Sequence, residues 1–147
     1  MTPDPFSYSP TPFLTLSQGD PVAVAYANAN RAAGLSYNFS TRFEFLAGGT
    51  RAELRLLEQQ YGIQLIRDVP LPQLQQTAAQ LRGAFTDGRV LGYWDSQVAA
   101  SAFLKGERMA TGDLQFYKRA MDLGLNVEYV GTGNSALKAA QYVPKPP

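Results

Sequence analysis

Apolar and polar positions follow two different periods along the chain, and the two periods alternate. Apolar residues three and four positions apart predict helices, as at Leu74, Ala78, Leu81 and Phe85, which share one face of a helix over 74–85. Short apolar runs bounded by glycine or polar residues predict strands, as at 35–39 and 63–66. Further strands are predicted at 13–16, 109–110 and 127–130, and further helices at 20–33, 40–47, 95–105, 114–123 and from Thr50 onward.

This alternation of strands and helices indicates crossover connections between parallel strands. The predicted fold class is α/β, a three-layer α/β/α sandwich with a central, mostly parallel sheet. In such sheets, binding sites form where the carboxyl ends of strands meet the first turns of helices. Any candidate chemistry is therefore expected at that edge.

The two ends of the chain lack either period. Residues 1–12 contain four prolines and are predicted to be a proline-rich arm or linker, and 144–147 (PKPP) a flexible tail. The 147-residue chain is 45% hydrophobic and 17% charged, which is typical of a globular protein. We therefore expect one domain over 13–143.

The absence of both cysteine and histidine excludes several kinds of chemistry. A thiol nucleophile, a serine–histidine relay, a histidine general base and a Cys/His zinc site all need residues that the chain lacks. A metal would have to be held by oxygen, which favours Mg²⁺, Mn²⁺ or Ca²⁺ on carboxylates.

Net charge and hydropathy exclude fewer functions than the missing residue types do. The net charge is +1, and because a cation bound to clustered acids would neutralise them, this weak charge does not exclude a phosphate-bearing partner. No apolar run approaches the roughly 20 residues of a membrane span, so no membrane partner is expected. A chain without cysteine is compatible with a reducing or an oxidising compartment.

Four acids stand where the predicted strands end or the helices begin. Asp113 follows the strand at 109–110, and Asp95 starts the helix that leads into that strand. Glu44 lies in the short helix after the strand at 35–39, and Asp20 heads the first helix. The four carboxylates are therefore expected to meet at one edge of the sheet.

Such a cluster has a functional and a structural interpretation. Neighbouring carboxylates repel one another and raise one another's pKa, which a divalent cation would compensate. Alternatively, Asp20, Asp95 and Asp113 are helix N-caps, each worth about 1 kcal/mol. Glu44 is harder to explain structurally, because Phe43 and Phe45 flank it in a segment expected to be largely buried.

Three segments resemble the successive acidic motifs of PIN-domain nucleases: STRFEFLAGG (40–49), WDSQVAASAFLKG (94–106) and MATGDLQFYKRAMDLGLNVEYV (109–130). In that family a glutamate follows the second strand, an aspartate opens an alanine-rich helix, and a Thr-x-Asp pattern ends the fourth strand. The resemblance covers 13–130 and implies the PIN-like fold. It assigns the three motif acids to Glu44, Asp95 and Asp113.

The first family motif is the least regular here, since the family has an apolar strand that ends directly in an aspartate. Asp20 is the candidate because DPVAVAYA continues as a helix; another register places Ser17 there and leaves three acids. The Thr-x-Asp pattern implies that the Thr111 hydroxyl supports the acids or contacts water, and its alternative is a β-branched residue that ends a strand. Asp122 and Glu128 match no motif and are expected on the solvated surface.

Basic and aromatic residues flank the motifs in sequence. The basic ones could contact phosphates, although solvated helix faces would explain them equally well; they are Arg42, Lys105, Arg108, Lys118 and Arg119. The aromatic ones could stack on bases, although core packing is the commoner role; they are Tyr93, Trp94, Phe116 and Tyr117.

The resemblance implies a divalent-metal-dependent endoribonuclease, a hydrolase that cuts RNA such as transfer or messenger RNA. Asp20, Glu44, Asp95 and Asp113 would hold Mg²⁺ or Mn²⁺. Similar domains act as toxins paired with a protein antidote, so the resemblance implies action in the cytoplasm, with an antitoxin or immunity protein and a second copy of the chain as partners. The proline-rich arm would suit a toxin module that ends a larger secreted polypeptide. Two alternatives stay open: a PIN-like RNA- or protein-binding module without cleavage, and a DNA nuclease of similar architecture.

Overall fold

A single parallel sheet organises the molecule. The computed structural model describes residues 6–8 and 16–147, and all four strand pairs found there are parallel. The strand order is β3-β2-β1-β4-β5. The strands are β1 (Phe6–Tyr8), β2 (Leu35–Tyr37), β3 (Ile63–Leu65), β4 (Arg108–Thr111) and β5 (Val127–Tyr129).

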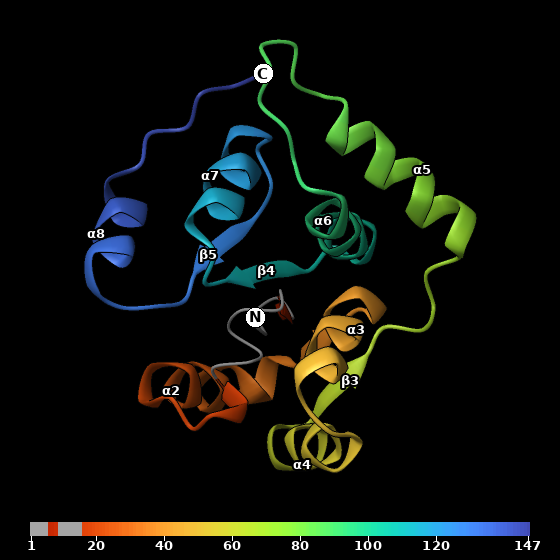
Figure 1. Cartoon of the computed structure of the whole chain (residues 1–147), viewed down its shortest axis with the longest axis vertical. Coiled ribbons are helices and arrows are strands. Elements are labelled where there is room, and N and C mark those ends of the chain that lie inside the picture. Colours follow the sequence, from red (N-terminus) through yellow and green to blue (C-terminus); the bar gives the residue numbers. More distant parts are fainter. Residues whose placement is uncertain (1–5, 9–15) are drawn as a thin grey trace.

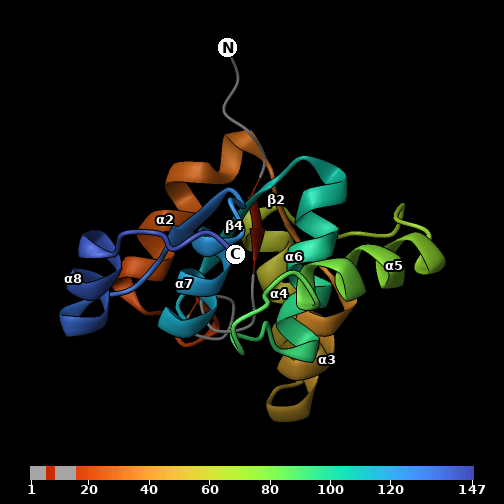
Figure 2. The same cartoon turned by 90° about the horizontal axis from the view of Figure 1, so that it is seen from above.

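Helices cover both faces of this sheet. They are α2 (Pro21–Asn30), α3 (Phe39–Gly48), α4 (Arg51–Tyr61), α5 (Leu71–Arg82), α6 (Tyr93–Lys105), α7 (Leu114–Asp122) and α8 (Gly133–Gln141), with a short 3₁₀ turn at Arg31–Ala33. Figure 1 shows α2 and α4 on one side of the strands and α6 and α7 on the other. In both views α5 lies beside α6 and α8 beside α7 (Figures 1 and 2).

The core confirms the three layers. Successive strand residues point to opposite faces of a sheet. In β4, Met109 packs into the cluster with Val98 of α6, whereas Ala110 packs into the cluster with Ala27 of α2 and Leu57 of α4. The predicted α/β/α sandwich with a parallel sheet is therefore confirmed.

The central strand differs from the prediction. β1 at Phe6–Tyr8 falls inside the segment predicted to be an arm outside the domain, and it pairs with both β2 and β4. Only three residues form the strand, and prolines stand on both sides of them in the sequence, so the pattern of the segment is that of a linker. The strand predicted at 13–16 lies mostly outside the described residues; Leu16, its last residue, is buried and helical.

Side-chain caps explain where most of the helices begin. Asp20 accepts the Ala23 N–H at 3.0 Å and caps α2, and Asp113 accepts the Phe116 N–H at 3.0 Å and caps α7. Thr50 caps α4 and accepts the Glu53 N–H, as the spacing predicts. Asp95 is not a cap, because α6 begins two residues earlier and Gly92 occupies the N-cap position.

The end of the chain also differs from the prediction. Asp122, expected on the surface, is 3% exposed, and its Oδ1 accepts hydrogen bonds from the Tyr142 hydroxyl at 2.6 Å and the Lys145 N–H at 2.8 Å. The Arg89 guanidinium binds Asp122 and the carbonyls of Lys145 and Pro146. These contacts tie 144–147, expected to be a flexible tail, to α7. Glu128 is partly exposed as expected, with its carboxylate 3.3 Å from the Tyr26 hydroxyl.

No element was predicted over 133–141, where the structure has α8, a short helix that packs on α7. Among the described residues, no helix has the length and apolar character needed to cross a membrane.

Candidate functional site

Three of the predicted acids come together at the carboxyl edge of the sheet, the edge where the parallel strands end. Asp113 follows β4, Asp95 lies in the first turn of α6, and Glu44 lies on α3, the helix that follows β2. Burial raises the pKa of Asp95 to about 6, with further contributions from the charges of Asp113 and Glu44. We call Glu44, Asp95 and Asp113 the acid cluster.

No basic side chain in the described part of the chain forms an ion pair with this cluster. In residues 16–147, the ion pairs of Arg and Lys go to other acids: Asp68, Asp87, Asp122 and Glu128. The pKa of Glu44 is also raised, by burial. Because desolvation and like charges both disfavour ionisation, the cluster is a place where a cation would be stabilised.

Buried hydrogen bonds fix the elements that carry these acids. At the start of α3, Asn38 is 1% exposed; its Oδ1 accepts the Thr41 N–H at 3.0 Å, and its Nδ2 donates to Ser101 Oγ of α6 at 3.1 Å. This link joins the helices of Glu44 and Asp95. Thr111 is fully buried, and its Oγ1 accepts the Asp113 N–H at 3.1 Å. The Thr111 hydroxyl therefore positions the Asp113 backbone.

Asp20 lies beside the acid cluster rather than within it. Its side chain is exposed and caps α2, and its charge is not among those that raise the pKa of Asp95. It lines a small hollow of about 190 Å³ together with Gly112, the residue before Asp113, and Tyr129 at the end of β5. Asp20 thus reaches the same edge of the sheet, beside the residue that precedes Asp113.

Two further features bear on whether a hard cation suits this site. Ser40, one helical turn before Glu44 on the same face of α3, is fully buried, and its Oγ has no hydrogen-bond partner among the described residues. Gly92 leaves room for the Asp95 carboxylate, because a Cβ there would lie 3.3 Å from Asp95 Oδ2. Oxygen ligands without basic partners suit Mg²⁺ or Mn²⁺ by their chemistry. In the described part of the chain, however, no three acids already stand at ligand spacing.

Exposed aromatic side chains border the acids. Phe43 and Trp94, the neighbours of Glu44 and Asp95 in sequence, stack with ring centroids 5.4 Å apart, and Tyr93 meets Trp94 edge to face at 5.1 Å. Of the other two aromatics predicted near the motifs, Phe116 is a core residue at 1% exposure, and Tyr117 packs against Tyr129. Stacking on a base thus stays a prediction for Tyr93, Trp94 and the half-buried Tyr117.

The five basic residues proposed from the sequence are widely separated. Lys105 and Arg108 lie at the opposite edge, where α6 ends and β4 begins, and they face Asp68 and Glu128. On α7, Lys118 lies over the ring of Tyr142 and Arg119 lies 3.8 Å from Asp122. Only Arg42, on α3, reaches the carboxyl edge. There it lines a hollow with Arg51, Arg55 and Arg67, which sequence reasoning missed although Arg51 and Arg55 are spaced to share a helix face.

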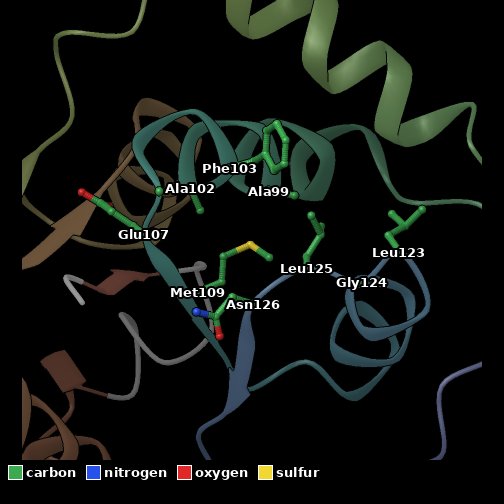
Figure 3. Close-up of a pocket in the computed structure, with 10 residues that line it drawn as sticks. Ala99, Ala102, Phe103, Glu107, Met109, Leu123, Gly124, Leu125 and Asn126 are labelled. Atoms are coloured by element: carbon green, nitrogen blue, oxygen red, sulfur yellow. The ribbon is translucent and has the colours of Figure 1, made fainter. Parts of the chain in front are cut away.

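A separate apolar cavity of about 330 Å³ lies at the amino edge of the sheet (Figure 3). Figure 3 shows Phe103 and Ala99 of α6 facing Met109 of β4 and Leu125. Glu107 is the one carboxylate among its lining residues. The cavity lies at the opposite edge of the sheet from the acid cluster, and its lining is mostly apolar, so we place the candidate site at the acids.

Comparison with known proteins identifies the fold. No profile of a known protein family and no curated protein sequence matches the chain. Two solved structures are similar to this chain. The first is VapBC2 from Rickettsia felis bound to a DNA fragment from their promoter; its TM-score is 0.70, with 12% identity, and the match covers 86% of this chain and 99% of that one. The second is FitAB bound to an IR36 DNA fragment; its TM-score is 0.60, with 18% identity, and the match covers 84% of this chain and 94% of that one. The PIN-like fold expected from the sequence is thereby confirmed.

Proposed function

We propose that this PIN-like chain is a divalent-metal-dependent endoribonuclease whose acid cluster, with Asp20 beside it, holds Mg²⁺ or Mn²⁺. The observation that carries the proposal is the placement of Glu44, Asp95 and Asp113 on three separate segments at the carboxyl edge of the sheet, near enough that the charges of Asp113 and Glu44 add to burial in raising the pKa of Asp95. The chain has no histidine or cysteine to offer instead.

The side chains of the site would have separate roles in cation binding and in positioning. A bound cation would lower the pKa of an attacking water and stabilise negative charge on the phosphodiester. Glu44, Asp95 and Asp113 would hold that cation. The Thr111 hydroxyl keeps the Asp113 backbone in place, and the Asn38–Ser101 hydrogen bond keeps α3 against α6, so that both helices present their acids from fixed positions.

The cleavage test uses purified protein with total RNA, single-stranded DNA and duplex DNA, each with Mg²⁺, Mn²⁺ or EDTA. We expect RNA cleavage that EDTA abolishes, and a loss of at least about a hundredfold in Asp95→Asn and Asp113→Asn. Asp68→Asn is the matched control, because it removes an exposed carboxylate outside the acid cluster. Full activity in either cluster variant would overturn the assignment, and cleavage of DNA alone would replace RNA as the substrate.

A second candidate is a PIN-like module that binds RNA or protein without cutting it. The exposed position of Asp20 outside the acid cluster favours this candidate, since the fourth acid then does not add to the site. It predicts no cleavage with any cation, together with RNA binding that survives in Asp113→Asn.

The family resemblance further supports a toxin that acts in the cytoplasm, pairs with a protein antidote and forms a homodimer. Expression in bacteria should arrest growth, and Asp113→Asn should relieve the arrest. Co-expression of the gene product encoded next to this chain should relieve it as well. Normal growth with active protein present would contradict the toxin role and leave the nuclease proposal intact.

A further inference from the structure

A strongly basic hollow lies on the carboxyl edge, at the ends of β2 and β3. It encloses about 320 Å³ and is lined by four arginines from three segments: Arg42 of α3, Arg51 and Arg55 of α4, and Arg67 after β3. The remaining lining residues are Tyr37, Leu54, Glu58 and Leu65. We call this the arginine hollow.

The four guanidinium groups have no acidic partner in the described part of the chain. The ion pairs found there involve other basic residues, and none of the four has a hydrogen bond to another described side chain. Arg51 and Arg55 are one helical turn apart, so they share a face of α4. Like charges gathered in a concavity repel one another, and an anion from outside would relieve that repulsion.

Glu58 is the one carboxylate among the lining residues, and Tyr37 engages it. Tyr37 is 1% exposed, and its hydroxyl donates to Glu58 Oε1 at 3.2 Å. Burial raises the pKa of Tyr37 to about 12, with a further contribution from Glu58, and the charges of Arg42 and Arg67 act in the opposite direction. The hydroxyl therefore stays protonated, and the four arginines keep their excess of positive charge over Glu58.

We propose that the arginine hollow binds backbone phosphates of a single polynucleotide strand whose neighbouring segment occupies the acid cluster. This inference rests on the proposed function, which supplies the polynucleotide. Guanidinium groups bind phosphate oxygens through paired N–H donors, and exposed arginines are weakly hydrated compared with lysines.

The position of the hollow supports a shared substrate. Tyr37 and Leu65 end their strands at the same edge of the sheet as Asp113. Arg42 and Glu44 are two positions apart on α3, so they point in different directions around that helix. Arg42 faces the hollow, while the charge of Glu44 acts on Asp95 of α6. One strand laid across α3 would meet the acids on one side and the arginines on the other.

The test measures binding without cleavage. A short fluorescein-labelled single-stranded RNA is titrated with the Asp113→Asn protein in Mg²⁺, with and without Arg55→Ala/Arg67→Ala. We expect binding about tenfold weaker at low salt, and a plot of log K against log salt that is shallower by about 1.4, or about 0.7 for each lost phosphate contact. Arg31→Ala/Lys138→Ala removes the same charge from exposed helix ends elsewhere, and should leave most of the affinity and slope.

Several outcomes would overturn the proposal. Equal losses of RNA affinity in the two double variants would show that only the net charge of the protein matters. Unchanged binding in Arg55→Ala/Arg67→Ala would show that the arginine hollow does not contact the RNA. A polyglutamate peptide that competes as well as the RNA would assign the hollow to an acidic polypeptide instead. Unchanged thermal unfolding checks that each variant is folded, and Arg55→Lys/Arg67→Lys, which keeps the charge but loses the paired donors, should recover only part of the affinity.

The two proposals fail separately. If the wild-type protein cuts no RNA and the arginine variants still lose binding, the nuclease proposal fails and the arginine hollow stands. If cleavage needs the acid cluster while Arg55→Ala/Arg67→Ala binds normally, the hollow proposal fails alone.

Discussion

Asp122 and Asp95 show two ways in which a protein encloses an acid. The Asp122 side chain has no exposed surface, and it accepts hydrogen bonds from the Tyr142 hydroxyl, the Lys145 N–H and Arg89. Burial alone would raise its pKa, yet these donors hold the pKa below its usual range. Asp95 accepts no such hydrogen bonds from the described residues, and burial, followed by the charges of Asp113 and Glu44, raises its pKa to about 6.

The comparison separates an acid with a structural role from the acid that we propose holds the cation. Asp122 is stabilised by groups within the chain, and its charge helps to hold α7 and the last residues together. The charge of Asp95 is opposed by its surroundings, so ionised Asp95 destabilises the fold unless something outside the chain compensates it. Strongly perturbed acids without internal partners cluster at functional sites.

The largest expected change in stability comes from removing Asp122, the acid whose charge is compensated by groups within the chain. Asp122→Ala should lower the free energy of unfolding by about 4 kcal/mol, because it leaves the buried donors around it without an acceptor. Chemical denaturation measures the change. Asp68→Ala, which removes the partner of an exposed ion pair, should change stability little. A loss in Asp122→Ala no larger than that in Asp68→Ala would contradict the structural role.

At the acid cluster, removing a carboxylate is expected to increase the stability of the fold. Asp95→Asn should raise the free energy of unfolding by about 2 kcal/mol at pH 8 in EDTA, because it removes a charge that burial and its neighbours disfavour. The same substitution should abolish cleavage. Denaturation curves measure the stability, and a destabilised Asp95→Asn protein would show that Asp95 has partners within the chain.

The pH dependence of stability should also differ between Asp95 and Asp122. The folded pKa of Asp95 lies above the unfolded value, so the folded state binds more protons, and stability is lost as pH rises from about 4 through about 6. The folded pKa of Asp122 is lowered, so its contribution is present above about pH 4 and is lost as pH falls further. Asp95→Asn should flatten the first slope and Asp122→Asn the second.

The smallest of these effects should come from the cation itself. Mn²⁺ at about ten times its Kd should stabilise the wild-type protein by about 1.4 kcal/mol, because it binds the folded state alone. Thermal unfolding in Mn²⁺ and in EDTA measures this without any need for cleavage. Asp113→Asn should lose the stabilisation, and equal stabilisation in both proteins would place the cation elsewhere.

Most of the fold could be predicted because the spacing of apolar residues along the chain shows which positions are buried. The strands β2, β3, β4 and β5 are short apolar runs, and the helices between them carry apolar faces, so each appears in the sequence within a few residues of its observed bounds. The strand β1 could not be predicted in this way. Its three residues owe their pairing to neighbours far along the chain, and the surrounding prolines dominate the local pattern.

The positions of the candidate site residues could be predicted in part for a similar reason. Helix starts and strand ends locate Glu44, Asp95 and Asp113, because topology alone brings these positions to one edge. The role of Asp122 depends on Arg89, Tyr142 and Lys145, which contact it only in the folded chain. The same holds for the arginine hollow, where the two arginines of α4 meet Arg42 and Arg67 from different elements.

The place of β1 in the sheet has a consequence for biosynthesis. Its backbone joins β2, at Leu35–Tyr37, to β4, at Arg108–Thr111, so the two halves of the sheet are connected through it. During translation β1 is made first, but it lacks its second neighbour until β4 has left the ribosome. Asp113 follows two residues after β4. The joining of β1 to β4 and the assembly of the acid cluster therefore fall at almost the same point in synthesis, before β5 is added at the sheet edge, and a nascent chain that ends before β4 lacks both.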